Sequence, residues 1–176
     1  SREKAHELAR GALDLVKLPE GSVDGLGAAG LKKLELARAL ATQPKILLAD
    51  DSITIQKVIE LTFSDEDFEV VTVGNGRLAI ERLPEARPDL VLCDIIMPEK
   101  DGYEVCEFIK KNPSLSHIPV LLLTGAFEPF DQERAARVGC DGFLAKPFEP
   151  QTLIAKVKDL LAKAASKPAA PMAAAP

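Results

Sequence analysis

Residues 89–102 read DLVLCDIIMPEKDG, and this stretch decides the fold. Its apolar run, 90–93, has the length and composition of a strand buried on both faces of a parallel sheet. The run ends at Asp94, and Pro98 and Gly102 then follow, which is typical of a loop that leads into a helix. The stretch therefore predicts a buried strand that delivers a carboxylate to the start of a loop.

The same alternation of a short apolar run with an amphipathic segment occurs five times between residues 45 and 163. Strands are predicted at 46–49, 69–73, 90–93, 120–123 and 142–145, and helices at 53–63, 76–83, 102–111, 130–138 and 151–162. Repeated strand–helix units with right-handed crossovers build an α/β fold with a doubly wound parallel sheet. We therefore expect five parallel strands covered by helices on both faces.

Polar residues follow four of these predicted strands, at the edge where such sheets bind ligands. They are Asp50-Asp51, Asp94, Thr124-Gly125 and Lys146-Pro147. Three converging carboxylates repel one another unless a cation neutralises them, and Mg²⁺ prefers oxygen ligands. The pattern predicts a Mg²⁺ site in which Thr124 and Lys146 bind a phosphoryl group and Asp94 is the nucleophile. Taken singly, any of these residues is more often structural than catalytic, since Asp and Thr at such positions are common caps.

In order and spacing, these residues resemble the receiver domain of two-component response regulators. The resemblance covers residues 45–163, including DIIMPEKDG and the triplet Lys146-Pro147-Phe148. It implies a flavodoxin-like sheet of strand order 2-1-3-4-5 and phosphorelay signalling, with a histidine kinase or phosphotransfer protein as the donor. It also implies that an output protein or domain docks on the face formed by the fourth helix, fifth strand and fifth helix.

The resemblance also implies a role for each matching position near the metal. Asp51 would bind Mg²⁺ directly, Asp50 mainly through water, and Asp94 through its carboxylate. The main-chain carbonyl of Ile96 would complete the protein ligands.

Further positions concern the phosphoryl group and its readout. The resemblance implies that Asp94 is phosphorylated, that Thr124 and Lys146 contact the phosphoryl group, and that Lys146-Pro147 is cis. Phe143 occupies the switch-aromatic position beside Thr124, with a plain core position as the alternative. Tyr103 is expected to pack at the start of its helix rather than serve the site.

Residues 1–43 read as helix, glycine-rich break, helix, and residues 164–176 as an Ala/Pro-rich disordered tail. Residues 26–50 resemble the signature helix and Walker B strand of an ABC transporter ATPase. The chain has no Gly-x-x-x-x-Gly-Lys-Ser/Thr loop, so we expect this segment neither to bind nor to hydrolyse ATP. An ATPase fragment in an engineered or natural fusion, and a helical hairpin that covers the receiver, are the two interpretations.

Composition narrows the function classes. The chain of 176 residues carries a net charge of −5, and residues 44–163 hold 14 basic against 21 acidic side chains, which disfavours direct nucleic-acid binding. No apolar run has the ~20 residues that span a bilayer and no signal peptide begins the chain, so we expect a cytoplasmic protein. The three cysteines are expected to be buried thiols and the two histidines to bind no metal.

Three function classes compete for this sequence. The leading hypothesis is a phospho-accepting signalling module without enzymatic turnover beyond self-dephosphorylation. The enzyme alternatives are a nucleotide hydrolase, disfavoured by the missing phosphate loop, and a phosphatase with an aspartyl nucleophile, disfavoured by Ile96 where a second Asp is usual. A non-signalling chimera or scaffold is the third class, and the intact Asp94, Thr124 and Lys146 count against it.

Overall fold

The structure, a computed structural model, describes residue 10, residues 43–127 and residues 129–166. Within the unit that begins at Pro44, five strands form one parallel sheet in the order β2-β1-β3-β4-β5. The strands are β1 (Lys45–Ala49), β2 (Glu69–Val73), β3 (Leu90–Asp94), β4 (Val120–Gly125) and β5 (Gly142–Lys146). The helices between and after them are α3 (Ile53–Thr62), α4 (Gly76–Ala86), α5 (Gly102–Lys111), α6 (Gln132–Val138) and α7 (Pro150–Ser166). The predicted fold class and strand order are confirmed.

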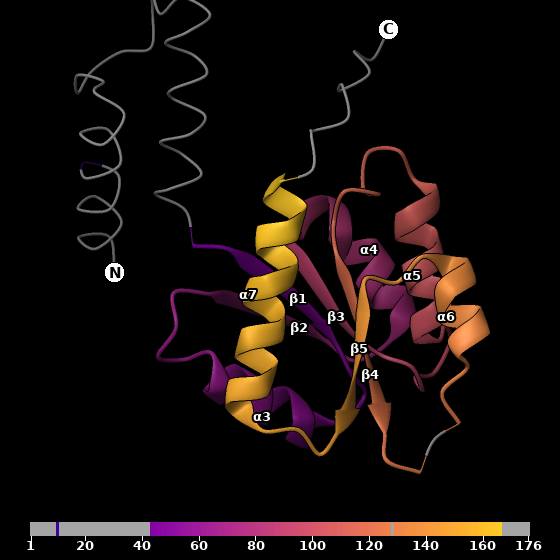
Figure 1. The fold of residues 1–176 in the computed structure, drawn as a ribbon, viewed down its shortest axis with the longest axis horizontal. Coiled ribbons are helices and arrows are strands. Elements are labelled where there is room, and N and C mark those ends of the chain that lie inside the picture. Colours follow the sequence, from indigo (N-terminus) through magenta and orange to yellow (C-terminus); the bar gives the residue numbers. More distant parts are fainter. Residues whose placement is uncertain (1–9, 11–42, 128, 167–176) are drawn as a thin grey trace, which may run out of the picture. The chain divides into compact units, whose positions relative to one another are not determined.

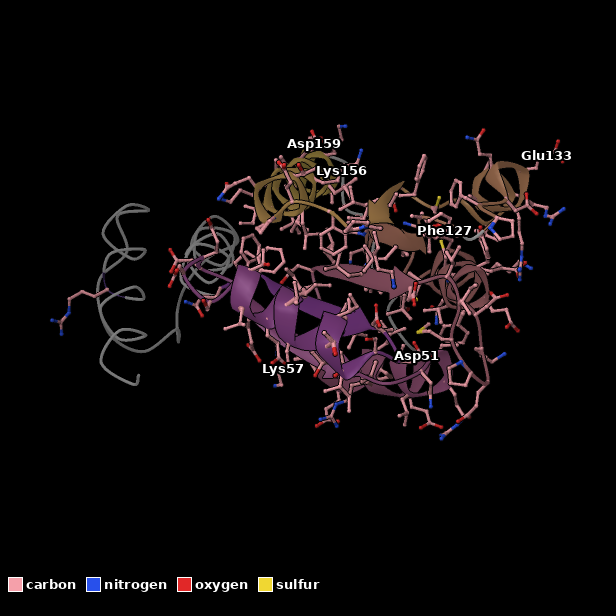
Figure 2. The ribbon with its side chains drawn as sticks, turned by 90° about the horizontal axis from the view of Figure 1, so that it is seen from below. Asp51, Lys57, Phe127, Glu133, Lys156 and Asp159 are labelled. Atoms are coloured by element: carbon pink, nitrogen blue, oxygen red, sulfur yellow. The ribbon has the colours of Figure 1, made fainter. Side chains whose placement is uncertain are left out.

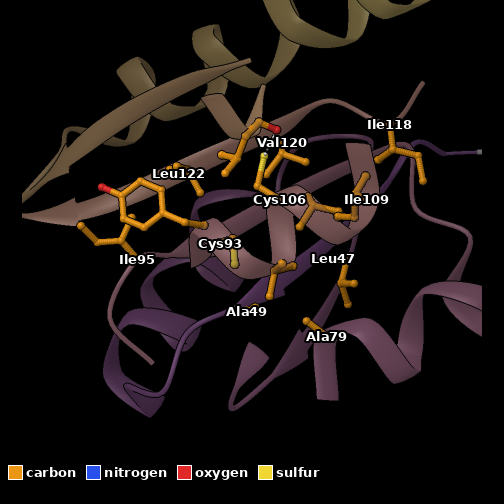
Figure 3. Close-up of a cluster of buried hydrophobic side chains, with 14 of the residues drawn as sticks. Leu47, Ala49, Ala79, Cys93, Ile95, Cys106, Ile109, Ile118, Val120 and Leu122 are labelled. Atoms are coloured by element: carbon orange, nitrogen blue, oxygen red, sulfur yellow. Dashed lines mark hydrogen bonds between the residues drawn. The ribbon is translucent and has the colours of Figure 1, made fainter. Parts of the chain in front are cut away.

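The helices form a layer on each face of the sheet (Figure 1). Helices α3 and α7 cover one face, where they pack on Leu48, Leu92 and Leu121. Helices α4, α5 and α6 cover the other, and Figure 3 shows Leu47 and Leu122 in that cluster. Because side chains alternate along a strand, neighbouring leucines of one run supply both layers, which explains why the central strands are apolar at every position.

Short polar side chains begin the helices and thereby fix the loops at the carboxyl edge of the sheet. Ser52 caps α3, Asn75 caps α4 and Asp131 caps α6, each accepting a hydrogen bond from a main-chain N–H of the first turn. At α5, Asp101 and Glu104 form a reciprocal capping box. Each cap stands shortly after a strand, so it determines where the chain turns at this edge.

Three helices differ in length from the sequence prediction by more than one residue. Helix α4 continues through Pro84 to Ala86, three residues past its predicted end, and Pro84 is exposed on its surface. Helix α6 begins at Gln132 because Asp131 is its cap. Helix α7 extends to Ser166, into the predicted tail, because its alanines are strong helix formers. The predictions for residues 1–42 and 167–176 lie outside the described residues.

Candidate functional site

The parallel register brings the acidic residues together at one edge of the sheet. Ala49 of β1 pairs with Cys93 of β3, so Asp50 and Asp94, the next residues, lie side by side. Carboxylate oxygens of Asp50, Asp51 and Asp94 all lie within 4.8 Å of one another. Asp50 and Asp94 are buried, whereas Asp51 is exposed beside the first turn of α3 (Figure 2). Two carboxylates are therefore fixed in the protein and the third faces solvent.

Asp50 is held through four of its atoms. Its N–H donates to the Val73 carbonyl at 3.1 Å, and its Oδ1 accepts from the Ser52 N–H at 2.9 Å. Its carbonyl accepts from Gln56 Nε2 at 2.6 Å, and its Oδ2 lies 3.2 Å from Lys146 Nζ. Asp50, which directly precedes the exposed Asp51, thus contacts residues of β2, α3 and β5 at once.

Lys146 brings a positive charge into the acidic cluster from the end of β5. Its Nζ lies 3.0 Å from Asp94 Oδ1 as well as 3.2 Å from Asp50 Oδ2. Partial burial would lower the pKa of Lys146, but its hydrogen bonds and charge interactions with Asp94 and Asp50 outweigh that effect and raise it. The ammonium is therefore charged at neutral pH, and the peptide bond to Pro147 is cis as the resemblance implied.

The loop after Asp94 folds back against the strand that carries it. The Gly102 N–H donates to the Ile95 carbonyl at 3.1 Å, and a Cβ at Gly102 would lie only 2.4 Å from the Asp94 carbonyl oxygen. Only glycine fits this approach. Within the loop Ile96 is exposed, so its side chain stands in solvent at the rim of the site.

One residue of this loop has an unusual backbone. Glu99 has φ of 69°, in the left-handed region, which costs energy for a residue with a side chain. Two donors from the start of α4 hold its carboxylate, namely Asn75 Nδ2 at 3.1 Å and Arg77 Nε. These contacts attach the loop to α4, and no pattern in the sequence indicates them.

Thr124 lies at the end of β4, and Phe143 lies in the neighbouring strand β5. Thr124 is buried and its hydroxyl donates to the Gly125 carbonyl at 3.2 Å. Phe143 is 46% exposed, so the interpretation of this residue as core is wrong. Its ring lies against Phe130, with centroids 4.3 Å apart.

Tyr103 packs as predicted at the start of α5, where it is buried. Its ring lies 6.3 Å from that of Phe130, and the guanidinium of Arg134 stands 4.5 Å above it. Its hydroxyl accepts a hydrogen bond from the Asp131 N–H at 3.1 Å. Tyr103, Phe130 and Phe143 therefore form a row of rings from α5 to β5.

The donor set fits a hard divalent cation such as Mg²⁺. Three carboxylates supply only oxygen ligands, and one of them remains exposed to complete a shell with water. A softer metal would require nitrogen or sulfur ligands. The described residues bring none to this cluster, since Cys93 is buried in the core and His117 lies on the surface.

Two of the three cysteines are buried thiols, as predicted, whereas the third is only partly buried. Cys93 and Cys106 are buried and Cys140 is half-buried. Burial raises the pKa of Cys106 to about 12 and that of Cys93 well above its usual range. Such thiols are poor nucleophiles at neutral pH.

Comparison with known proteins assigns this architecture to a family. The family model described as "Response regulator receiver domain" matches residues 46–158, and the chain belongs to this family. It is 32% identical over 117 residues to the alkaline phosphatase synthesis transcriptional regulatory protein PhoP of Bacillus subtilis, covering 66% of this chain and 48% of the relative. It is 33% identical over 119 residues to the transcriptional regulatory protein GltR of Pseudomonas aeruginosa, covering 68% and 49%. The chain thus spans about half the length of these relatives.

Solved structures agree with the match. The chemotaxis response regulator CheY4 of Vibrio cholerae superposes with a TM-score of 0.63 at 33% identity, over 68% of this chain and 99% of that one. The receiver domain of a signal transduction histidine kinase from Syntrophus aciditrophicus gives 0.66 at 35% identity, over 74% and 99%. The matched family model begins at residue 46, and the ABC-ATPase resemblance of residues 26–50 remains a prediction that falls largely outside the described residues. No described helix is both long and apolar enough to cross a membrane.

Proposed function

We propose that this chain is a cytoplasmic receiver that accepts a phosphoryl group on Asp94 from the phosphohistidine of a histidine kinase or phosphotransfer protein. A carboxylate oxygen of Asp94 attacks phosphorus, the phosphorus–nitrogen bond to the donor breaks, and the imidazole leaves with that electron pair. An acyl phosphate forms and no further reactant is needed. The observation that carries this proposal is the position of Lys146 Nζ, 3.0 Å from Asp94 Oδ1 within a cluster of three carboxylates.

Charge explains why this site suits phosphoryl transfer. An isolated acidic cluster repels an anionic donor, so the attack requires positive charge at the same edge. Lys146 supplies one such charge, and Mg²⁺ held by Asp50, Asp51, Asp94 and the Ile96 carbonyl would supply Lewis-acid stabilisation of the phosphoryl oxygens. Thr124, at the end of β4, would donate its hydroxyl to the product. The proposal assigns no turnover beyond self-dephosphorylation.

The readout is proposed to involve β5 and its neighbours. Phe143 is exposed on β5 and stacks on Phe130, which precedes α6. A Thr124 hydroxyl drawn toward the phosphoryl group would leave space for this ring, changing the α6–β5–α7 face on which an output protein or domain would dock. A scaffold or non-signalling chimera would have no need of a charged lysine between two buried carboxylates.

Phosphorylation with a small acyl-phosphate donor tests the function. We expect Mg²⁺-dependent addition of one phosphoryl group, detected as intact mass, and none in Asp94→Asn. Asp159→Asn, on the surface of α7, is the matched control and should be labelled like the parent. Stoichiometric labelling of the Asp94→Asn variant would show that the nucleophile is assigned wrongly, and equal labelling in EDTA would exclude a role for Mg²⁺.

A further inference from the structure

Gln56 lies one turn into α3 and reaches back to the end of β1. Its Nε2 lies 2.6 Å from the Asp50 carbonyl oxygen. Only the amide nitrogen can make this contact, because the partner is a carbonyl and accepts. The Gln56 main chain is fixed as well, since its N–H donates to the Ser52 carbonyl at 2.9 Å. A side chain on a fixed helix turn therefore holds one particular peptide group.

That peptide group joins the two acids of the pair. The carbonyl of Asp50 and the N–H of Asp51 belong to one planar unit, so fixing the carbonyl fixes the direction in which the chain enters Asp51. The position of the Asp50 side chain is already fixed, because this residue is buried and bound to Val73, Ser52 and Lys146. Asp51 is exposed, and packing does not hold it in place. The orientation of the exposed carboxylate thus depends on the peptide that Gln56 holds.

We propose that Gln56 is a positioning residue for the Mg²⁺ site, acting through the Asp50–Asp51 peptide. This inference rests on the proposed function, in which Asp51 is a metal ligand. Mg²⁺ demands near-ideal octahedral geometry, so a rotated peptide that displaces one carboxylate weakens binding. Partners that orient metal ligands without touching the metal act in this way.

The start of α3 does not require the Gln56 side chain, because another residue caps this helix. Ser52 caps the helix, and its Oγ accepts from the Ile55 N–H at 3.4 Å. Loss of the Gln56 amide should therefore leave the helix in place while changing the metal site. This difference separates a positioning residue from a helix anchor.

The test compares Gln56→Met, which keeps the shape and removes the donor, with Gln151→Met, the same change on the exposed start of α7. Titration calorimetry with MgCl₂ as the only divalent salt gives the affinity, and thermal unfolding in EDTA gives metal-free stability. We expect Gln56→Met to bind Mg²⁺ about tenfold more weakly than the parent. Gln151→Met should bind like the parent, and both variants should unfold within a few degrees of it.

Gln56→Glu separates orientation from charge. Its carboxylate has the same length but offers only acceptors to the Asp50 carbonyl, while it adds a negative charge near the cation. A simple Coulomb effect predicts tighter Mg²⁺ binding, whereas loss of the positioning contact predicts weaker binding. Tighter binding by Gln56→Glu, or an unchanged affinity in Gln56→Met, would overturn the inference.

A measurement on the metal-free parent protein keeps the inference testable even if a variant fails to fold. The scalar coupling across the hydrogen bond, between Gln56 Nε2 and the Asp50 carbonyl carbon, should be detectable by NMR. Its absence would contradict the inference and leave the proposed function standing. A parent protein that shows the coupling and yet binds no Mg²⁺ would overturn the proposed metal site, and this inference with it.

Discussion

The central strands and the edge strand β5 end at the same edge of the sheet but in different environments. Every residue of β3 is buried, and so are the last four of β1. In β5, half-buried and exposed residues alternate. The central strands deliver the acids Asp50 and Asp94, and β5 delivers Lys146 and Phe143. In the proposed function, the buried acids that hold Mg²⁺ thus come from the core, whereas Phe143, the ring proposed to respond, comes from the edge strand.

Energies support this division. Displacing a side chain of the close-packed centre costs several kcal/mol, because a cavity or a clash results. Separating the rings of Phe143 and Phe130 costs about 0.5–1.5 kcal/mol beyond lost burial. A hydrogen bond from the Thr124 hydroxyl to a charged phosphoryl oxygen returns about 1.5–3 kcal/mol. In the proposed function, phosphorylation would therefore move the aromatic ring of the edge strand while the central strands stay in place.

The largest expected effect is a difference in stability between these strands. Leu122 of β4 is fully buried, whereas Leu144 of β5 is only partly buried. We expect Leu122→Ala to lower the free energy of unfolding by about 3–5 kcal/mol and Leu144→Ala by about 1–2 kcal/mol. Urea denaturation at 25 °C measures both, each variant serving as the other's control. Equal losses would show that β5 is as tightly packed as the centre.

Removal of the edge strand's charge should come next in size. Lys146→Met should slow phosphorylation by a small acyl-phosphate donor by roughly a hundredfold, the effect of losing one preorganised stabilising group. It should still bind Mg²⁺, because all the carboxylates remain. Lys158→Met, on the surface of α7, is the control for loss of a charge. A rate near that of the parent would show that Lys146 only neutralises Asp50 and Asp94.

Lys146 should stay charged as the pH rises above neutral, so the phosphorylation reaction should keep this positive charge. The raised pKa of Lys146 means that the charged form is favoured by its folded-state partners, Asp94 and Asp50. Its contribution to stability is therefore complete at neutral pH and is lost only at alkaline pH, as the ammonium titrates. Between pH 7 and 9 the phosphorylation rate of the parent should therefore not fall through deprotonation of Lys146. Deprotonation would appear as a decrease that is present in the parent and missing in Lys146→Met. Such a decrease, followed by stopped-flow or timed mass measurements, would contradict the raised pKa.

The sequence predicted much of this, for identifiable reasons. Runs such as 90–93 were recognised as strands because their burial on both faces makes every position apolar. The positions of Asp50, Asp94 and Lys146 followed from strand ends, because a parallel sheet collects these ends at one edge.

What the sequence did not reveal depends on side-chain direction. Gln56 resembles any polar residue on a helix surface until the structure shows its amide on the Asp50 carbonyl. The hydrogen bonds of Arg77 and Asn75 with Glu99 join residues more than twenty positions apart, and no periodic pattern in the sequence indicates them. The end of α4 was predicted too early because a proline inside a helix usually ends it.

The rim of the site should set the lifetime of the acyl phosphate. Ile96 is exposed two residues after Asp94. We expect a polar side chain at this position to orient an attacking water, which the apolar side chain of Ile96 cannot do. Ile96→Asn should therefore shorten the phosphoprotein half-life several-fold, within the range of general acid–base assistance. Leu61→Asn, an equally polar change at an exposed position on α3, should not. An unchanged half-life in Ile96→Asn would refute the water-orientation argument.

The last expected effect concerns the edge strand itself. With a beryllium fluoride mimic on Asp94, amide hydrogen exchange should change across residues 124–148, while β1 and β3 keep their rates. The magnitude should be up to about tenfold in protection, because one ring contact of about 0.5–1.5 kcal/mol is exchanged for another.

Phe130→Leu removes the partner of Phe143, so part of this change should be present before the mimic is added. Phe108→Leu, on the exposed side of α5, is the matched control. If exchange changes only in the loop 95–101, β5 does not respond to Asp94, and the contrast between a fixed centre and a responsive edge does not hold.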